Sequence, residues 1–184
     1  MATFAAAFKF VDSVGYPQPS SGKSPQGIHV TSTTQNYPLL TRIEAVDPVL
    51  GKAEFVYAKG VASTTIGEGI QLNPDGTTIR AAGGTAVGHI GVAMSANVAN
   101  QYGWYCVKGR VPLKIAADVT ANLQGFLAAA GIWADDVAAT KLVSRAAIEA
   151  GLDAGGSAIV GTDDTTEAHF AIGVVHYPYA IKAV

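Results

Sequence analysis

Residues 69–80 read Gly-Ile-Gln-Leu-Asn-Pro-Asp-Gly-Thr-Thr-Ile-Arg. The centre of this stretch, Asn73-Pro-Asp-Gly76, is typical of a tight turn, because proline presets φ and glycine adopts a positive φ most easily. The residues on either side, Gly69–Leu72 and Thr77–Arg80, are short runs of the kind that form strands. The stretch therefore predicts a β-hairpin.

Strand patterns continue along the chain on both sides of this hairpin. Each is a short run of β-branched, aromatic or small apolar residues. The runs are Glu54–Gly60, Val87–Met94, Tyr102–Gly109, Val111–Ile115 and Glu167–Val175. Short strands at this spacing predict a mainly β fold, a small tulip-like β-barrel or β-sandwich, and not parallel βαβ units.

Glycines inside these runs predict close packing between strands. Glycine in a strand interior lowers stability unless a neighbouring group approaches closely or the strand bends. The sharply curved strands of a small closed barrel would satisfy that condition. The glycines concerned are Gly88, Gly91, Gly103 and Gly173.

The alanine-rich region 116–168 gives weaker patterns. Gly125–Gly131 fits a helix or a strand, because periodicity does not separate short apolar runs. Asp135 and Asp136 are typical of a helix N-terminus, so Ala134–Thr140 is expected to form one or two helical turns. Gly151–Gly156 and Gly161–Asp164 are expected to be loops or hairpin turns.

The first part of the chain is rich in proline and in uncharged polar residues. Five of the eight prolines lie within the first 48 residues. Proline fixes φ and pushes the preceding residue toward extended geometry. Residues 1–45 are therefore predicted to be an extended arm, with one strand at Gly27–Thr33, and residues 46–184 to be the β domain.

Aromatic residues in the arm suggest that it lies on a partner, because aromatic rings gain free energy from burial. They are Phe4, Phe8, Phe10, Tyr16 and Tyr37. The alternative is a flexible linker. In a second aromatic group, Tyr102-Gly-Trp-Tyr105, strand alternation would send Tyr102 and Trp104 to one face and Tyr105 to the other. Core packing is the simpler interpretation of these rings, and Trp104 is also a candidate for partner or sugar contact.

Composition excludes several function classes. Hydrophobic residues make up 49% of the 184 residues, charged residues only 14%, and the net charge is −2. A chain without a basic run cannot neutralise the phosphates on which sequence-independent nucleic-acid binding depends. The single cysteine, Cys106, excludes an intramolecular disulfide and a cysteine-based zinc cage.

The hydropathy pattern gives no sign of a membrane segment. The start of the chain lacks the basic and long apolar regions of a signal peptide. The longest strictly apolar run, residues 126–134, is far shorter than the roughly 20 residues that a helix needs to cross a bilayer. We therefore expect no contact with membranes.

Fragments of catalytic and ligand-binding motifs are present, but each lacks its context. Ser21-Gly-Lys-Ser24 resembles the end of a phosphate-binding loop, yet Pro17 occupies the place of the first glycine. Asp163-Asp164 fits a solvated turn better than a calcium site, which needs six or more oxygens. Cys106 lies in an apolar strand without a group that would lower its pKa.

The four histidines do not form a metal-binding pattern. They are His29, His89, His169 and His176. His169 and His176 are seven residues apart, which puts them on opposite faces of one strand. The sequence therefore predicts no metal, no cofactor and no enzymatic activity. The competing enzyme hypothesis is a hydrolase that uses His89 or His169 with an aspartate.

Two segments resemble a family of structural proteins from tailed bacteriophages. They are Asp47-Pro-Val-Leu-Gly-Lys-Ala-Glu-Phe-Val-Tyr-Ala-Lys-Gly60 and Ile90-Gly-Val-Ala-Met-Ser-Ala-Asn-Val-Ala-Asn-Gln-Tyr-Gly-Trp104. Members share an AEF-[VI]-Y-x-KG strand and an IGVAM…QYGW segment, followed by a strand that ends in glycine, here Gly109. The resemblance covers about residues 35–115.

This resemblance implies a capsid decoration or cement protein, a small β-barrel on the outer surface of the shell. Its partners would be the major capsid protein and copies of itself, as a dimer or trimer, and it would be made in the host cytoplasm and reside on the virion exterior. A protein of this class needs a rigid module, a reaching arm and repeated contacts, not reactive side chains. The alternative function is a carbohydrate-binding head or fibre module that stacks sugars on Trp104 and Tyr102.

Overall fold

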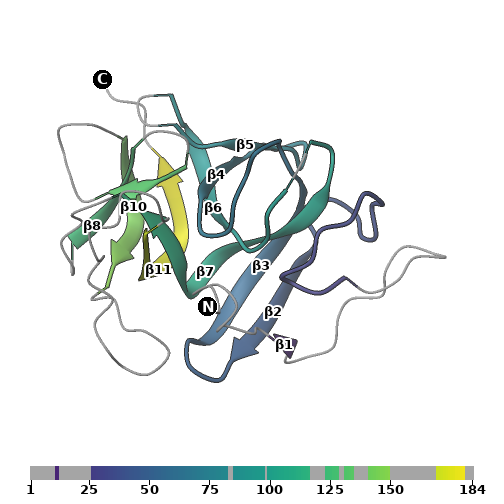
Figure 1. Ribbon diagram of the computed structural model, residues 1–184, viewed down its shortest axis with the longest axis horizontal. Coiled ribbons are helices and arrows are strands. Elements are labelled where there is room, and N and C mark those ends of the chain that lie inside the picture. Colours follow the sequence, from purple (N-terminus) through teal and green to yellow (C-terminus); the bar gives the residue numbers. More distant parts are fainter. Residues whose placement is uncertain are drawn as a thin grey trace.

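The protein is built from strands, as the computed structural model shows (Figure 1). The structure describes residues 11–12, 26–82, 85–97, 99–116, 123–128, 131–134, 141–149 and 169–180, and no helix occurs among them. The strands are β1 (Val11–Asp12), β2 (Arg42–Asp47), β3 (Gly51–Lys59), β4 (Gly69–Leu72), β5 (Thr78–Arg80), β6 (Gly88–Ala93), β7 (Tyr102–Ile115), β8 (Leu123–Leu127), β9 (Trp133–Ala134), β10 (Lys141–Ile148) and β11 (His169–Ala180). The predicted mainly β fold is confirmed.

All strands belong to one sheet with the order β1-β2-β3-β7-β9-β8-β10-β11-β6-β4-β5 and additional pairings of β7 with β11 and β6. The nine strands longer than two residues pair antiparallel, and they do not close into a barrel. Closure was one of the arrangements expected from the strand glycines, and the described strands do not adopt it. No helix in the described ranges is long and apolar enough to span a membrane.

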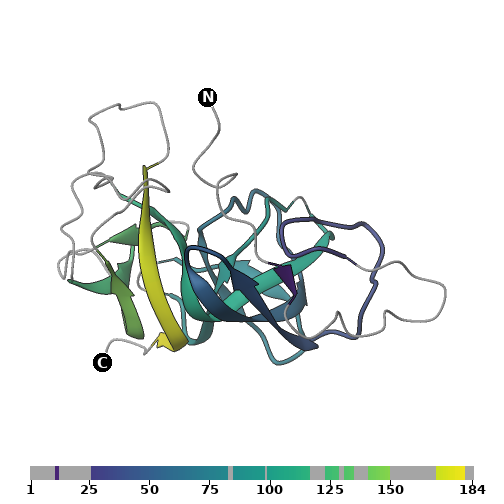
Figure 2. The same ribbon diagram turned by 90° about the horizontal axis from the view of Figure 1, so that it is seen from below.

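The long strand β7 joins two groups of strands. Its first half pairs with β3, from Lys59↔Tyr102 to Glu54↔Lys108, and its second half pairs with β11, from His176↔Lys108 to His169↔Ile115. Figure 1 shows β7 between β2 and β3 on one side and β8, β10 and β11 on the other. The same two groups are separated in the view from below (Figure 2).

The hairpin predicted at residues 69–80 is confirmed. β4 pairs with β5 antiparallel, from Ile70↔Arg80 to Leu72↔Thr78. The turn is closed by the Gly76 amide, which donates to the Asn73 carbonyl at 3.0 Å. Gly76 has a φ of 79°, the conformation for which glycine was expected there.

Residues 102–115 form one strand where the sequence suggested two. Gly109 has a φ of 127°, and a Cβ there would lie 2.5 Å from Ala53 Cβ, so glycine lets the chain bend and continue. Pro112 pairs with Ile172, and no other described strand pairs with β7 at that position. The missing proline N–H therefore interrupts no second ladder. The run that fitted a helix or a strand, residues 125–131, contains the end of strand β8.

Gly173 bears out the expectation of close approach. A Cβ at this position would lie 2.1 Å from Leu113 Cδ1 and 3.0 Å from the Ala147 carbonyl oxygen. β11 therefore packs against β7 and β10 at a distance that excludes a side chain.

Residues 26–45 pack as part of the body, which corrects their assignment to an arm. Tyr37 is fully buried, and its ring lies 5.1 Å from Tyr57 and 5.2 Å from Trp104. The strand expected at Gly27–Thr33 is reduced to a bridge between Ser32 and Tyr102. The expected boundary after residue 45 falls inside β2. Burial of aromatic rings decides the position of this segment, in spite of its proline and polar content.

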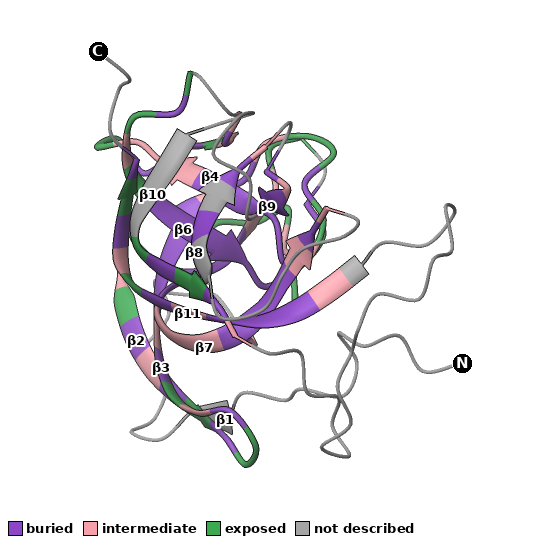
Figure 3. Cartoon of the chain, turned by 90° about the vertical axis from the view of Figure 1, so that its left-hand side faces the viewer, coloured by how far each residue is buried: buried purple, intermediate pink, exposed green. Residues whose placement is uncertain are grey.

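The main core cluster takes side chains from β2, β3, β6, β7 and β11 among other strands, and buried residues follow β6 and β7 (Figure 3). Its largest fully buried side chains include Trp104, Trp133, Tyr37, Tyr57 and Phe55. The alternation predicted for residues 102–105 is confirmed, because Trp104 belongs to the main core cluster and Tyr105 to a second cluster on the other face. The loops expected at 151–156 and 161–164, and the helical turns expected at 134–140 beyond their first residue, lie outside the described residues.

Candidate functional site

The second face of the sheet carries a groove. In β3, Phe55 and Tyr57 point to the main core, and Val56 lies on the opposite face. The register pairs Val56 with Arg42 of β2, which places the arginine on the same face as the valine. The sheet therefore buries one face and leaves part of the other open around Arg42.

The groove has a volume of about 540 Å³. Most of its lining is apolar, and the side chains come from β2, β3, β4, β6, β7 and β11 together with adjoining turns. The lining residues are Leu40, Arg42, Val56, Leu72, Asn73, Pro74, His89, Ile90, Val107, Tyr177 and Pro178. Its size and apolar character fall within the range of ligand-binding clefts in proteins.

Charges beside the groove leave one cation without a carboxylate. The Lys52 ammonium lies 2.7 Å from Glu44, and the Lys108 ammonium lies 3.6 Å from Glu54. Arg42 forms no ion pair with any described residue, and its guanidinium lies over the Tyr177 ring, 5.6 Å from the centroid. This cation–aromatic contact positions the guanidinium, and no residue in the described ranges accepts a hydrogen bond from its side-chain donors.

Tyr177 lines the groove and also contacts the Lys108–Glu54 ion pair. Its hydroxyl donates a hydrogen bond to Glu54, and the Lys108 ammonium lies 5.7 Å from the centroid of its ring. The hydrogen bond to Glu54 raises the pKa of the Tyr177 hydroxyl, so the group stays neutral at physiological pH.

Two bulky residues in the lining adopt a left-handed backbone. Leu40 has a φ of 66° and Tyr177 a φ of 51°. Such conformations cost of order 1–3 kcal/mol in residues other than glycine and persist where the surrounding structure holds them. The Leu40 amide, for example, donates to the Tyr57 carbonyl at 2.8 Å. The walls of the groove are therefore held in shape by the strands beneath them.

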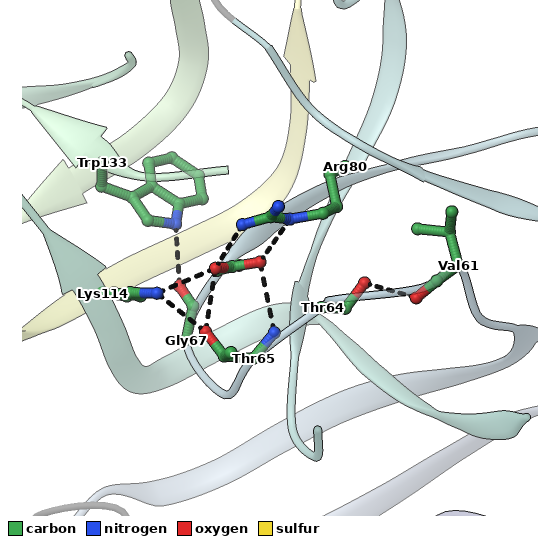
Figure 4. A network of polar contacts seen from close by, with 8 residues as sticks. Val61, Thr64, Thr65, Gly67, Arg80, Lys114 and Trp133 are labelled. Atoms are coloured by element: carbon green, nitrogen blue, oxygen red, sulfur yellow. Dashed lines mark hydrogen bonds and ion pairs between the residues drawn. The ribbon is translucent and has the colours of Figure 1, made fainter. Parts of the chain in front are cut away.

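A buried ion cluster lies at the turn before β4. Glu68 is fully buried, and its carboxylate accepts hydrogen bonds from Arg80, Lys114 and Thr65 (Figure 4). The Trp133 indole N–H donates to the neighbouring Gly67 carbonyl at 3.1 Å. Burial alone would raise the pKa of Glu68, but the hydrogen bonds from Arg80, Lys114 and Thr65 outweigh it and lower the pKa. Because both of its oxygens accept hydrogen bonds from these residues, the carboxylate links the turn to β5 and β7, a structural role.

The described side chains of His29, His89, His176 and Cys106 do not converge on one site. His89 is exposed and meets Tyr179 edge to face, and His176 is exposed beside Tyr177. His29 lies within 3.2 Å of the Met94 carbonyl, and burial lowers the pKa of this histidine. Cys106 is fully buried, which raises the pKa of its thiol. In the described ranges no three histidine, cysteine, aspartate or glutamate side chains are grouped as metal ligands.

The structure corrects two of the predicted contact residues. Tyr37 and Trp104 are both fully buried, and the Trp104 indole N–H donates to the Gln26 carbonyl at 2.9 Å. They pack against Tyr57, so they stabilise the core and do not touch a partner from the surface. The other predicted contacts, Phe4, Phe8, Phe10 and Tyr16, lie outside the described residues.

Sequence reasoning missed the groove. Leu40 and Arg42 lie far from Tyr177 in the chain, and a lone arginine at the start of a strand is no motif. Only the register that pairs Arg42 with Val56, together with the return of β11 beside β6, brings them to one face. The Glu68 cluster was missed for the same reason.

No family model, curated protein or solved structure matches the chain.

Proposed function

We propose that the protein is a structural component of a tailed-bacteriophage virion, a decoration or cement protein. It binds the outer surface of the capsid and stabilises the lattice of the major capsid protein. It needs no cofactor and catalyses no reaction in this role. Its partners are the major capsid protein and copies of itself, as a dimer or trimer.

The observation that carries the proposal is how the two phage-like segments lie in the fold. The segment 47–60 contains β3, and the segment 90–104 contains the end of β6 and the start of β7. The first half of β7 pairs with β3, with Tyr57 opposite Trp104, and β6 pairs with β7 at Val92↔Cys106. Segments that are separated in the sequence thus pair with each other in the fold, and this pairing supports the proposal that the two motifs belong together.

The edge of the sheet at β2 supports strand addition as a mode of attachment. β2 is paired on its outer side with β1 at Val11↔Val46 and Asp12↔Ala45. Addition of a strand to a sheet edge is a general mode of recognition, in which backbone hydrogen bonds provide the affinity. On a repeating shell, even weak contacts of this kind add up across many copies.

The carbohydrate-binding alternative needs an exposed Trp104 ring, and this ring is buried. Trp104 is enclosed between Tyr37 and Tyr57, and Tyr102 is half-buried with its ring stacked on Tyr57 at 6.1 Å. A sugar cannot stack on Trp104 without opening the core. No observation favours this function over the decoration role, and we do not carry it further.

The test is binding of the purified full chain to capsids that lack it, measured by cosedimentation and electron microscopy. We expect saturable binding at fixed sites of the lattice and an increase in the temperature at which the capsids break open. Binding should persist as salt rises, because the interface would be mainly apolar and backbone-mediated. A chain that fails to bind such capsids at any salt concentration would overturn the proposal.

A matched pair of variants tests the role of the sheet edge. Deleting residues 1–12 removes β1, the strand that would add to the β2 edge of a neighbouring copy, and we expect weaker attachment with an unchanged circular dichroism spectrum. Substituting Val49→Thr at the exposed β2–β3 turn is the control, and it should bind as the unmodified chain does. Equal attachment by the deletion variant would show that strand addition at β2 plays no part.

A further inference from the structure

We propose that the groove around Arg42 binds an extended segment of a partner protein, with a carboxylate on the arginine and an aliphatic or aromatic side chain on the apolar floor. This inference concerns one site and goes beyond the proposed function. It holds whether or not the partner belongs to a virion.

The chemistry of the floor selects an apolar group. Val56, Val107 and Ile90 form it, and each exposes less than 5% of its surface, so the floor is firm and already packed from below. Leu40 rises beside it with 42% of its surface exposed. Covering such a leucine removes apolar surface from water and contributes to binding. In the described part of the chain the two buried polar atoms without partners are Ser95 Oγ and Asn97 Oδ1, and neither residue lines the groove.

The charge at the rim selects a carboxylate. The ion pairs Lys52–Glu44 and Lys108–Glu54 neutralise the neighbouring charges, and among the described residues at this rim Arg42 is the cation without a carboxylate partner. A guanidinium presents a planar fork of donors that matches a carboxylate in two parallel hydrogen bonds. The Tyr177 ring under the guanidinium limits its freedom, so less entropy is lost on binding.

The backbone indicates that the site is preformed. Leu40 and Tyr177 lie far apart in the sequence, and both line the groove in left-handed conformations, with φ of 66° and 51°. Strain of this kind gathers at binding clefts, where the fold holds side chains in the positions that a ligand needs. A rigid cleft lined by many strands fits an extended segment that lies along it.

A second copy of the chain fits the groove less well. A two-fold contact through this face would bring both copies of Arg42 into one interface. The nearby carboxylates Glu44 and Glu54 already pair with lysines, so the two guanidinium groups would repel each other. A partner that supplies its own carboxylate avoids this repulsion.

The experiment selects random linear peptides, displayed on a carrier, for binding to the full chain. We expect the enriched peptides to carry an aspartate or glutamate beside an aliphatic or aromatic residue. A selected peptide is then synthesised and titrated against the full chain by fluorescence anisotropy. Failure to enrich peptides, or enrichment of neutral or basic ones, would overturn the proposal.

Variants locate the binding site. Arg42→Glu should weaken binding about tenfold or more, because it replaces a charge-assisted hydrogen bond by repulsion. Leu40→Asn should weaken binding about fivefold, and asparagine tolerates the left-handed backbone that leucine adopts there. Arg145→Glu makes the same charge change at an exposed position of β10 and should leave the affinity unchanged. Equal loss in Arg42→Glu and Arg145→Glu would indicate a general effect of charge and refute the site.

Sedimentation of the full chain tests whether a second copy of the chain, and not a partner protein, occupies the groove. If the chain forms dimers that Arg42→Glu dissociates, a second copy fills the groove and the proposal is wrong. If the oligomeric state is the same with and without this substitution, the groove is free for a partner. Circular dichroism of each variant confirms that the fold is retained.

Discussion

Replacing Glu68 by glutamine keeps the shape of the side chain and removes its charge. The carboxylate accepts five hydrogen bonds, two from Arg80 at 2.8 Å, one from Lys114 at 2.9 Å and two from Thr65 at 2.8 and 3.2 Å. In the variant, one acceptor oxygen becomes a donor that faces other donors. Arg80 and Lys114 are left as partly buried cations without a counter-ion.

The magnitude follows from the burial of the three partners. Removing one member of a buried ion pair costs about 3–5 kcal/mol of unfolding free energy. The side chain of Glu68 is 0% exposed, but those of Arg80 and Lys114 are 28% and 20% exposed and can turn to water. We therefore expect Glu68→Gln to lower the free energy of unfolding by about 3 kcal/mol, the lower end of that range.

The assay is equilibrium unfolding in urea, followed by tryptophan fluorescence, with Glu44→Gln as the matched control. Glu44 pairs with Lys52 on the surface, with side chains 37% and 60% exposed, and an exposed pair contributes about 0–1 kcal/mol. If Glu68→Gln destabilises the protein no more than Glu44→Gln does, the cluster contributes little and our reasoning about its burial is wrong.

The pH dependence gives an independent check on the same residue. The folded state lowers the pKa of Glu68, so the unfolded chain binds a proton there more readily. The stabilisation is therefore complete above the usual glutamate pKa of 4.5 and is lost as the pH falls through the lower folded value. The difference between the unmodified chain and Glu68→Gln should shrink on acidification, and a constant difference would contradict the assignment.

Three further predictions concern the core. Gly173→Ala should lower the free energy of unfolding by about 1–3 kcal/mol, because the added methyl group meets Leu113. Adding Leu113→Ala to the same chain should recover part of that loss. If the losses of unfolding free energy of the two single variants simply add in the double variant, the contact is refuted. Trp104→Phe should cost about 2–4 kcal/mol in urea unfolding through a cavity and the lost hydrogen bond to Gln26, whereas a loss below about 1 kcal/mol would mean a looser core. Cys106 should react with a thiol reagent far more slowly in the folded chain than in denaturant, because burial raises its pKa and blocks access; rapid labelling of the folded chain would contradict its placement.

Local patterns in the sequence predicted the parts of the fold that depend on neighbouring residues. The turn Asn73–Gly76 determines its own hairpin, and alternation places Trp104 and Tyr105 on opposite faces. These signals need no knowledge of distant segments. The mainly β class follows from them.

The features that sequence reasoning missed depend on long-range register. Tyr37 lies in a proline-rich polar segment, and only its contact with Trp104 shows that the segment belongs to the core. Arg42 and Tyr177 meet through pairings between strands far apart in the chain, and Glu68 meets Lys114 in the same way. A pattern of residue types along the chain does not encode these distances.

The shared strand β7 has a consequence for how the molecule comes apart. Its first half completes the ladder with β3, and its second half completes the ladder with β11. Neither group of strands can detach without breaking the backbone hydrogen bonds of one half of β7. The amides of the two groups should therefore lose their protection from hydrogen exchange together. A load applied to one side of the molecule is then carried directly into the other by a single continuous stretch of chain.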